Sequence, residues 1–463
     1  MSAPVSAAAP LPPAAGRRVR VTEGSLARAI AALAAPMFFS ALLSNAQSLI
    51  DLFWVGRLGP EAIAAVAMGG TVVWVLSPML MGLATGTVAL VARAVGAGRR
   101  EDAAAAAGQS LLLAGFFGAL SAALGTIYAD RLIELLGAAP EVRAAGGGYL
   151  RIMLWGSFSV FFLFISNAGM QGAGDPITPM RLMLLANAIN IVLDPILIFG
   201  LGPAPRLGIA GAGWATLIAD ATAALFALRA LAGGRSALRV RAANLRPAGG
   251  ILWRLLRIGI PGSGQMLARS LMTAALMRIV AAFGTVAVAA YGTGMRFHMI
   301  VLMPAFALGG AAATIVGQNL GAGRSDRAQR GAWLAAAIGV GFMVASGLVL
   351  VLFAPALIRA FNPAPDVVAI GSVYLRTVSP FYIFAALAIV LGRGLNGAGD
   401  SLFPMLFTVA SLWGLQVPMA VALSRPTAFG LPGVWWAMSA ATAVHGLLVA
   451  GWFLTGRWKR ARV

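Results

Sequence analysis

The sequence has few of the residues on which reactive chemistry depends. Its 463 residues include no cysteine and only two histidines. Disulfides, thiol nucleophiles and cysteine-bound metals are therefore excluded, and a metal centre built on histidine is not expected. The HExxH pattern of zinc proteases, the GxSxG turn of serine hydrolases and the phosphate-binding loop of ATPases are also missing. We therefore expect no enzyme, no cofactor, and no ATP-driven pump unless a partner chain supplies the ATPase.

Charged side chains are also scarce, at 10% of the residues, whereas 60% of the residues are hydrophobic. Soluble domains are about 25% charged and about 45–50% apolar. The apolar residues fall in runs of about 20 or more, the length that crosses a bilayer as a helix. The sequence therefore predicts an all-α polytopic membrane protein with about twelve transmembrane helices. The expected spans are 29–53, 62–90, 104–127, 147–170, 177–199, 209–232, 259–283, 289–316, 331–353, 372–394, 403–424 and 433–455.

Acidic residues are rarer than basic ones. Only 14 acidic residues stand against 34 lysines and arginines, which gives a net charge of +20. The arginines cluster in alternate loops, which predicts that these loops and both termini face the cytoplasm of a bacterial inner membrane. No basic patch is interleaved with aromatic residues, so we do not expect nucleic-acid binding. The arginines assigned to the cytoplasmic side include Arg17, Arg18, Arg99, Arg246, Arg324, Arg393 and Arg460.

The two halves of the chain repeat each other. Pro36 matches Pro261, and the GAGR loop at 96–99 matches the GAGR loop at 321–324, both at a separation of 225 residues. Both prolines predict a helix kink. Each half has an even number of helices, so the halves are parallel repeats, as in transporters with two lobes around a V-shaped central cavity. The expected division is a disordered basic leader (1–28), an N-lobe (29–232), a cytoplasmic linker (233–258), a C-lobe (259–456) and a basic tail (457–463).

One membrane-length run carries polar side chains on a single helical face. Asn187, Asn190 and Asp194 are spaced at i, i+3 and i+7, which places them on one side of a helix. A carboxylate at membrane depth costs about 3 kcal/mol or more, and such residues are functional by default. Pro195 follows directly and removes a backbone donor, so we expect a kink there. The alternative is a satisfied carboxylate at a helix kink, with no role in turnover.

The acids inside the membrane do not repeat between the halves. Asp51 falls opposite Leu276, and the LDPIL segment around Asp194 is replaced by QVPMA in the second half. We therefore expect ion coupling to reside in the N-lobe. Taken alone, Asp51 is also compatible with an interfacial residue beside Trp54.

These segments together resemble those of multidrug and toxic compound extrusion (MATE) transporters. The similarity covers nearly the whole chain from about Ala35, and it rests on DLFWVGRLGPEAIAA, VGAGRREDA, NAGMQGAGDPITPM, NIVLDPI and GRGLNGAGDSLFPM. Among the subfamilies, the sequence is most similar to the prokaryotic DNA-damage-inducible type, in which protons load acids of the N-lobe. Carried over by motif, the resemblance implies ion-coupling roles for Asp51, Asp194, Asn190, Asn167 and Thr216.

The sequence departs from the sodium-coupled subfamily, which has acids in helices seven and ten. The seventh run offers Gln265 and Arg269 instead, and the segment VSPFYIFAALAIVLG of the tenth run has no charged residue. Asp220 has no counterpart in the family pattern. We expect it either to pair with an arginine or to line the cavity. A weaker substrate-cavity set comprises Asn187, Asp220, Gln265, Met266, Arg296 and His298. For the methionines, ordinary packing is the alternative.

The resemblance implies a monomeric secondary antiporter that exports cationic or amphipathic drugs or toxic metabolites across the bilayer in exchange for protons. Sodium held by Asp51, Asn190 and Asp194 is the rival coupling ion. A flippase for lipid-linked oligosaccharides shares the superfamily architecture and is the alternative transporter. A membrane receptor or scaffold that transports nothing is the alternative from another class.

Overall fold

The computed structural model describes residues 19–137, 140–234, 238–425 and 427–461, so Arg17 and Arg18 lie outside it. In these ranges the chain is helical and contains no strand. The first half forms α1 (Leu26–Gly56), α2 (Pro60–Trp74), α3 (Ser77–Gly96), α4 (Arg100–Leu135), α5 (Pro140–Gly172), α6 (Ile177–Phe199) and α7 (Ile209–Ala232). The second half forms α8 (Gly249–Ala281), α9 (Thr285–Gly321), α10 (Ser325–Phe361), α11 (Pro365–Val378), α12 (Tyr382–Ala398), α13 (Leu402–Val409), α14 (Val417–Leu423) and α15 (Leu431–Leu454).

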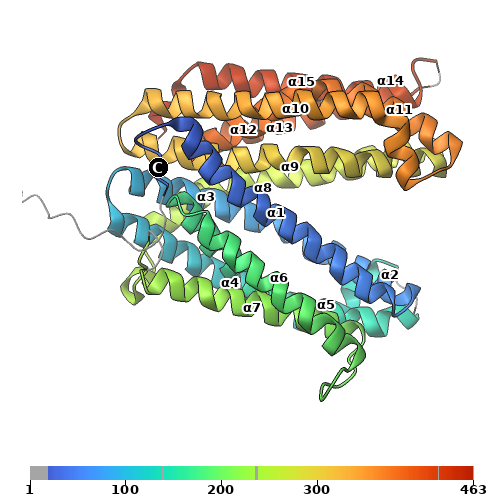
Figure 1. Ribbon diagram of the computed structural model, residues 1–463, viewed down its shortest axis with the longest axis horizontal. Coiled ribbons are helices and arrows are strands. Elements are labelled where there is room, and N and C mark those ends of the chain that lie inside the picture. Colours follow the sequence, from blue (N-terminus) through green and yellow to red (C-terminus); the bar gives the residue numbers. More distant parts are fainter. Residues whose placement is uncertain (1–18, 138–139, 235–237, 426, 462–463) are drawn as a thin grey trace, which may run out of the picture.

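The helices form two lobes, as the repeat predicts. Figure 1 shows α3 to α7 in one group and α9 to α15 in the other, with α1 running obliquely between them. The groups lie together at the end that carries the C-terminus and diverge toward the opposite end, in a V. We call α1 to α7 the N-lobe and α8 to α15 the C-lobe. The two-lobe membrane fold is therefore confirmed.

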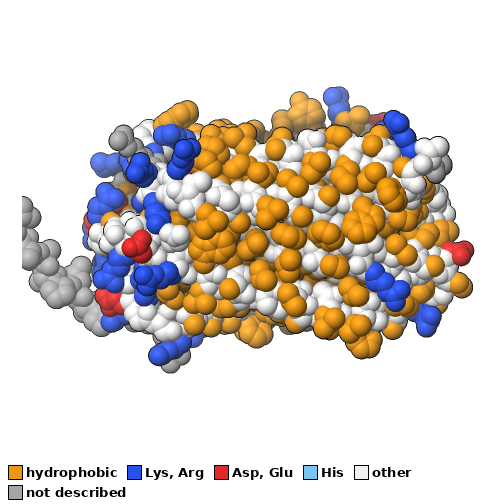
Figure 2. All heavy atoms as spheres, turned by 90° about the horizontal axis from the view of Figure 1, so that it is seen from above, with side chains coloured by type: hydrophobic (Ala, Val, Ile, Leu, Met, Phe, Trp, Pro, Cys, Tyr) orange, Lys and Arg blue, Asp and Glu red, His pale blue; other side chains and the backbone are white. Residues whose placement is uncertain are grey.

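The apolar surface fits a bilayer. Within the described residues, 11 helical spans are long and apolar enough to cross a membrane. The twelfth expected span corresponds to α8, which carries four arginines and packs along α3. Figure 2 shows hydrophobic side chains over the middle of the molecule, with most lysines and arginines gathered at one end. The protein is a multi-pass membrane protein.

Two expected spans are divided in the structure. The run 62–90 was expected as one helix, but α2 ends at Trp74 and α3 begins at Ser77. Between them, the amides of Val75 and Leu76 donate to the carbonyls of Val72 and Val73. Pro78 accounts for the break, because proline has no N–H and is best tolerated in the first turn of a helix. The run 372–394 is divided in the same way by a 3₁₀ turn, Ser379–Phe381, between α11 and α12.

The repeat extends to backbone geometry. Gly98 and Gly323, in the two GAGR loops, have φ angles of 75° and 72°. Gly174 and Gly399, in the two GAGD turns, have φ angles of 86° and 91°. Glycine enters this region of φ without the strain that a Cβ causes. The equivalent turns of the two lobes therefore share one backbone conformation.

Glycines bring the lobes into close contact along α3. A Cβ on Gly86 would lie 2.8 Å from the carbonyl oxygen of Leu255 in α8. A Cβ on Gly96 would overlap the carbonyl oxygen of Gln318 in α9. The Gln318 side chain in turn donates to the carbonyl of Gly172 over 2.8 Å. These contacts join the lobes at the end where the termini lie.

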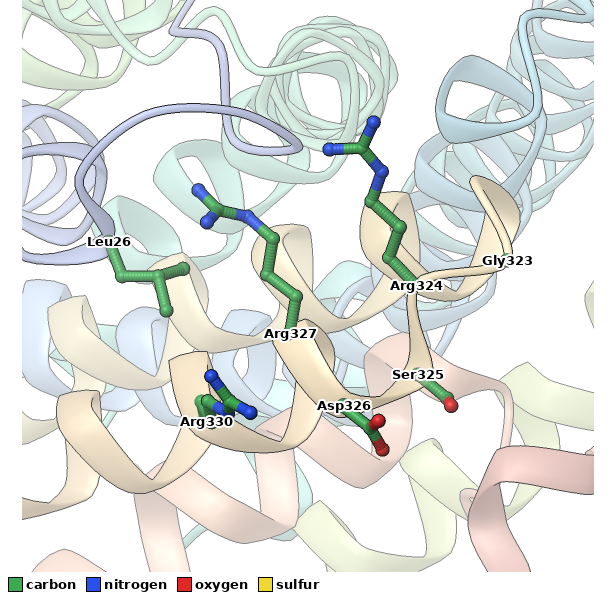
Figure 3. A pocket seen from close by; sticks show the side chains of 7 residues that line it. All are labelled: Leu26, Gly323, Arg324, Ser325, Asp326, Arg327 and Arg330. Atoms are coloured by element: carbon green, nitrogen blue, oxygen red, sulfur yellow. The ribbon is translucent and has the colours of Figure 1, made fainter.

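The N-terminal segment also joins the lobes. We call residues 19–25 the strap. The amide of Val19 donates to the carbonyl of Gly174 in the N-lobe over 3.0 Å. On the C-lobe side, Arg327 donates to the carbonyls of Val21, Glu23 and Gly24 over 3.2, 2.9 and 2.8 Å. Figure 3 shows Arg324 and Arg327 extending from the start of α10 beside the pocket that Leu26 also lines.

Candidate ion-coupling site

Helix α6 presents a buried polar face inside the N-lobe. Its residues Asn187, Asn190 and Asp194 are 3%, 0% and 0% exposed, as their spacing predicts. The helix runs through Pro195 to Phe199, and Gly200 ends it with a left-handed φ of 74°. Pro195 lies inside the helix and has no N–H to donate to the carbonyl one turn earlier. The kink expected there stays a prediction, as do those at Pro36 in α1 and Pro261 in α8, which also lie within their helices.

Asn190 is the centre of the polar cluster. Its Nδ2 atom lies 3.5 Å from Oδ1 of Asp194 and 3.4 Å from Oγ1 of Thr216 in α7. The Thr216 hydroxyl donates in turn to the carbonyl of Ala212 over 3.1 Å. The Asn190 amide group therefore connects α6 with α7 and holds the carboxyl group of Asp194 in place.

Asp51 brings a second carboxyl group from α1. It lies close enough to Asp194 and Asn190 for its side chain to interact with both. Oδ1 of Asp51 and Oδ2 of Asp194 are buried, and within the described residues neither accepts a hydrogen bond. Oδ1 of Asn190 is in the same state. An acceptor buried without a donor is costly, and a proton or a cation bound beside any of these oxygens would lower that cost.

Two residues of this site were missed at the sequence level. Gln47 is buried in α1, and its Oε1 accepts a hydrogen bond of 3.4 Å from Asn187. Tyr149 of α5 is buried and lies close enough to Asp51 and Asp194 to interact electrostatically with both carboxyl groups. Gln47 precedes Asp51 by one helical turn, so the spacing in the sequence could have placed it on the same helix face as Asp51. Tyr149 has no such signal, because only the packing of α5 brings it to the acids.

The structure gives the two remaining N-lobe candidates different surroundings. Asp220 of α7 is partly buried and lies within electrostatic reach of Asp51. It has no arginine partner among the described ion pairs. Asn167 of α5 shows no described contact with Asp51 or Asp194, and its Oδ1 is buried without a hydrogen-bond partner in the described chain.

The C-lobe candidates lie apart from these acids. Gln265 donates to Oγ1 of Thr408 over 3.1 Å, and Met266 beside it is partly buried. His298 Nδ1 lies 3.0 Å from the hydroxyl of Tyr382, while Arg296 is exposed. Arg393, which was assigned to the cytoplasmic side, lies in the last two turns of α12, with its guanidinium 5.5 Å from the ring of Phe306.

The described residues contain no group of three or more histidines, cysteines or acids that could hold a metal ion. A sodium ion at the N-lobe site would therefore need amide and hydroxyl oxygens from Asn190 and Thr216 besides the carboxylates. The oxygens present suit either a proton or such a hard monovalent cation.

Comparison with known proteins decides the family. The sequence matches the family described as MatE over residues 36–196 and 261–422. The chain belongs to the MATE family. The two matched stretches fall within the two lobes, as the repeat requires. Members of this family are transporters and not enzymes, so the MATE chain is a transporter.

Relatives match the MATE chain over nearly its full length. It is 28% identical over 435 residues to the "Probable multidrug resistance protein NorM" of Thermotoga maritima, covering 93% of each chain. It is 30% identical to the "FAD transporter" of Shewanella oneidensis, covering 81% of this chain and 82% of that one. A solved MOP superfamily transporter from Pyrococcus furiosus superposes with a TM-score of 0.86 at 27% identity, over 95% of this chain and 97% of that one.

Proposed function

We propose that this MATE protein is a proton-coupled antiporter that exports cationic, amphipathic small molecules. The observation that carries the proposal is the carboxyl pair of Asp51 and Asp194, which reach each other inside the N-lobe and keep an unpaired oxygen each. Two carboxyl groups that interact in this way titrate together and can share one proton. The name of the Thermotoga relative, a probable multidrug resistance protein, agrees with export of drugs.

The proposed cycle follows from charge balance in the carboxyl pair. Without protons, Asp51 and Asp194 attract a cation, and Asp220 adds to the negative potential. Protons arriving from the outer side neutralise the pair, so the cationic substrate loses its electrostatic partner and leaves outward. Asn190 and Thr216 keep the carboxyl of Asp194 in position in both states. Release of the protons inward then restores the site.

Topology and surroundings belong to the same proposal. The end of the molecule that carries most arginines in Figure 2 faces the cytoplasm of a bacterial inner membrane, with both termini on that side. The protein acts as a monomer without cofactor or nucleic acid, and its lobes correspond to residues 29–232 and 259–456. Sodium held by Asp51, Asn190 and Asp194 is the rival coupling ion.

Transport in liposomes tests this function. Purified protein is reconstituted into vesicles loaded with a fluorescent cationic dye, and a proton gradient or a sodium gradient is imposed separately. We expect proton-driven dye movement in the wild type and its loss in Asp194→Asn, which keeps the size of the side chain but not its charge. The matched control is Asp366→Asn, because Asp366 is an exposed acid at the start of α11.

The other outcomes separate the alternatives. Dye movement driven by sodium alone would keep the MATE transporter and replace the coupling ion. Full proton-driven transport by Asp194→Asn would refute coupling through the N-lobe acids. No dye movement under either gradient would favour a lipid-linked substrate or a receptor that transports nothing.

A further inference from the structure

A pocket lies where α1 meets the start of α10. It has a volume of about 350 Å³, and Leu26 of α1 forms part of its wall. Leu26 packs directly against α10, because a Cβ on Gly331 would lie 3.3 Å from its Cδ2 atom. The rest of the lining comes from residues 323–327 and Arg330, in the turn before α10 and in its first turns. The pocket is therefore built by two packed helices and the turn that precedes one of them.

Positive charge in this pocket exceeds negative charge. Its described lining includes Arg324, Arg327 and Arg330, but only one acid, Asp326. Asp326 lies 3.6 Å from Lys459, and Figure 3 shows its carboxyl group pointing away from the guanidinium groups of Arg324 and Arg327. These two arginines donate to backbone carbonyls of the strap, which have no net charge. Arg330 has no ion-pair partner among the described residues, so the pocket keeps an excess of positive charge.

The strap does not remove this excess. Its acid, Glu23, lines the next pocket along the strap, together with Arg20 and Arg28. That carboxylate therefore has basic neighbours of its own.

The sequence repeat shows that the fold does not require this charge. At the separation of 225 residues, segment 99–105 corresponds to segment 324–330. The first segment has two arginines and two acids, and Arg99 forms an ion pair of 3.2 Å with Asp102. The second has three arginines and one acid, because arginine replaces that aspartate and also an alanine three positions later. The glycines of both loops have nearly equal φ angles, so the charge of the second loop is not needed for the turn.

An exposed apolar face of α10 continues from the pocket. Arg330 is exposed, and the residues 7, 11 and 18 positions later lie on the same side of the helix. They are Ala337, Gly341 and Leu348, which are all exposed. A Cβ on Gly341 would meet nothing within 4 Å, so this face has room for an apolar chain. Because α10 is long and apolar enough to span a membrane, its exposed face contacts lipid.

We propose that this pocket binds the phosphate group of an anionic phospholipid whose acyl chains lie along α10. Guanidinium groups bind phosphate oxygens through paired N–H donors, and basic clusters beside a membrane span attract anionic headgroups. The hydroxyl of Ser325, which also lines the pocket, is a further donor. The apolar face favours a lipid over a soluble phosphorylated molecule. This site is separate from the N-lobe acids and does not depend on the ion that drives export.

Calorimetric titration of the full-length protein in uncharged maltoside micelles tests this site. Dihexanoyl phosphatidylglycerol is the anionic probe. Dihexanoyl phosphatidylcholine has the same chains but no net charge, and glycerol phosphate has the charge but no chains. We expect phosphatidylglycerol to bind the wild type at least about tenfold more tightly than either of the other two probes.

Arg330→Gln tests the pocket, because Arg330 lines it without a described hydrogen bond to the strap. Losing one charge-assisted bond should weaken the binding of phosphatidylglycerol about tenfold. The matched control is Arg100→Gln, which removes the same charge from the corresponding loop of the N-lobe, where Arg100 is exposed at the start of α4. This control should bind phosphatidylglycerol as the wild type does.

Ser325→Asp separates binding from folding. An acid in the first turn of a helix is favourable, so without lipid this variant should unfold at the wild-type temperature or above it. The new carboxylate would lie among the arginines of the pocket and repel a phosphate, so the binding of phosphatidylglycerol should again fall about tenfold. Wild-type affinity in both Ser325→Asp and Arg330→Gln would overturn the proposal, whatever their unfolding temperatures.

Three other results would also overturn it. Equal affinity for glycerol phosphate and phosphatidylglycerol would make the pocket a site for soluble phosphates. Equal affinity for phosphatidylcholine, or equal weakening by Arg100→Gln and Arg330→Gln, would mean that the pocket arginines do not select the headgroup. No binding of phosphatidylglycerol at about 10 mM, a concentration that detects even weak sites, would leave no lipid site. None of these results bears on dye export by the N-lobe acids.

Discussion

The surroundings of Asp220 could not be predicted from the sequence alone. The sequence allowed an ion pair with an arginine or a place beside the cavity. The structure places Asp220 within electrostatic reach of Asp51 and without an arginine partner in the described chain. A third acid within electrostatic reach of Asp51 would raise the negative potential that a cation meets.

Replacing Asp220 should therefore weaken substrate binding without abolishing coupling. Removing one nearby charge is worth about 1 kcal/mol in a partly hydrated site. We expect Asp220→Asn to raise the half-saturating dye concentration about fivefold while proton-driven movement persists. Initial rates of dye export over a range of dye concentrations measure this. Complete loss of transport in Asp220→Asn would contradict it and would place Asp220 in the coupling pair itself.

The ion-coupling candidates illustrate how far residues alone can lead. Asn187, Asn190 and Asp194 were predicted as one buried face because a helix repeats every 3.6 residues, and they are buried on one face. Tyr149 could not be found in that way. It belongs to another helix, and only tertiary packing sets its distance to Asp51 and Asp194.

At the scale of elements, α3 decides how closely the lobes approach. Its glycines at 86 and 96 lie directly against the backbone of α8 and α9, and Gly82 lies against both the backbone and the Ser263 hydroxyl of α8. Such close backbone contact at small residues is the usual way in which membrane helices pack. Any added atom there has to move one lobe against the other.

We expect Gly96→Ala to shift the protein toward a form in which this end of the interface is open. The new methyl group would overlap the carbonyl oxygen of Gln318, and overpacking of this kind costs about 1–3 kcal/mol. Because the chain has no cysteine, Thr85→Cys in α3 provides a single reporter thiol. Its maleimide labelling should become several-fold faster in the Gly96→Ala background.

The control for this substitution is Gly451→Ala in α15, where a Cβ meets nothing within 4 Å. Labelling of Thr85→Cys should stay at the parental rate in that background. Equal rates in all three proteins would mean that the interface absorbs the methyl group without opening.

Helix interruptions were harder to predict than helices. Apolar length indicated the membrane runs, but not the turn at Val75 and Leu76, where Ser77 and Pro78 were the only warning. The π-helical segment Ala410–Gln416 inside the run 403–424 was signalled only by Gly414 within it and Pro418 just after it. Hydrophobicity reports depth in a membrane, whereas such interruptions depend on which neighbouring helix packs against them.

At the scale of the whole molecule, both ends of the described chain cross from one lobe to the other. The strap reaches from Gly174 in the N-lobe to Arg327 in the C-lobe. Near the other terminus, Arg93 of α3 donates to the carbonyls of Ala398 and Ala461 over 3.1 and 2.6 Å. Separation of the lobes at this end would break both sets of contacts.

Loosening the strap should therefore favour that separation. Arg327→Gln removes most of the charge-assisted bonds to the strap, and we expect labelling of a Thr22→Cys reporter to become about tenfold faster, equivalent to about 1.4 kcal/mol. Arg330→Gln is the control, because Arg330 lines the same pocket without a described hydrogen bond to the strap. Unchanged labelling in Arg327→Gln would show that other contacts hold the strap, such as the hydrogen bonds that Arg324 and Asn319 donate to the carbonyls of Thr22 and Val21.

The charged residues singled out above differ in sign between the two lobes. Asp51, Asp194 and Asp220 belong to the N-lobe, and Arg269 and Arg393 belong to the C-lobe. Between them the electric field runs from lobe to lobe, across the direction in which a solute travels. A solute with charges at both ends would be turned crosswise by this field before it touched either group. Net charge alone would then be a poor guide to which solutes enter.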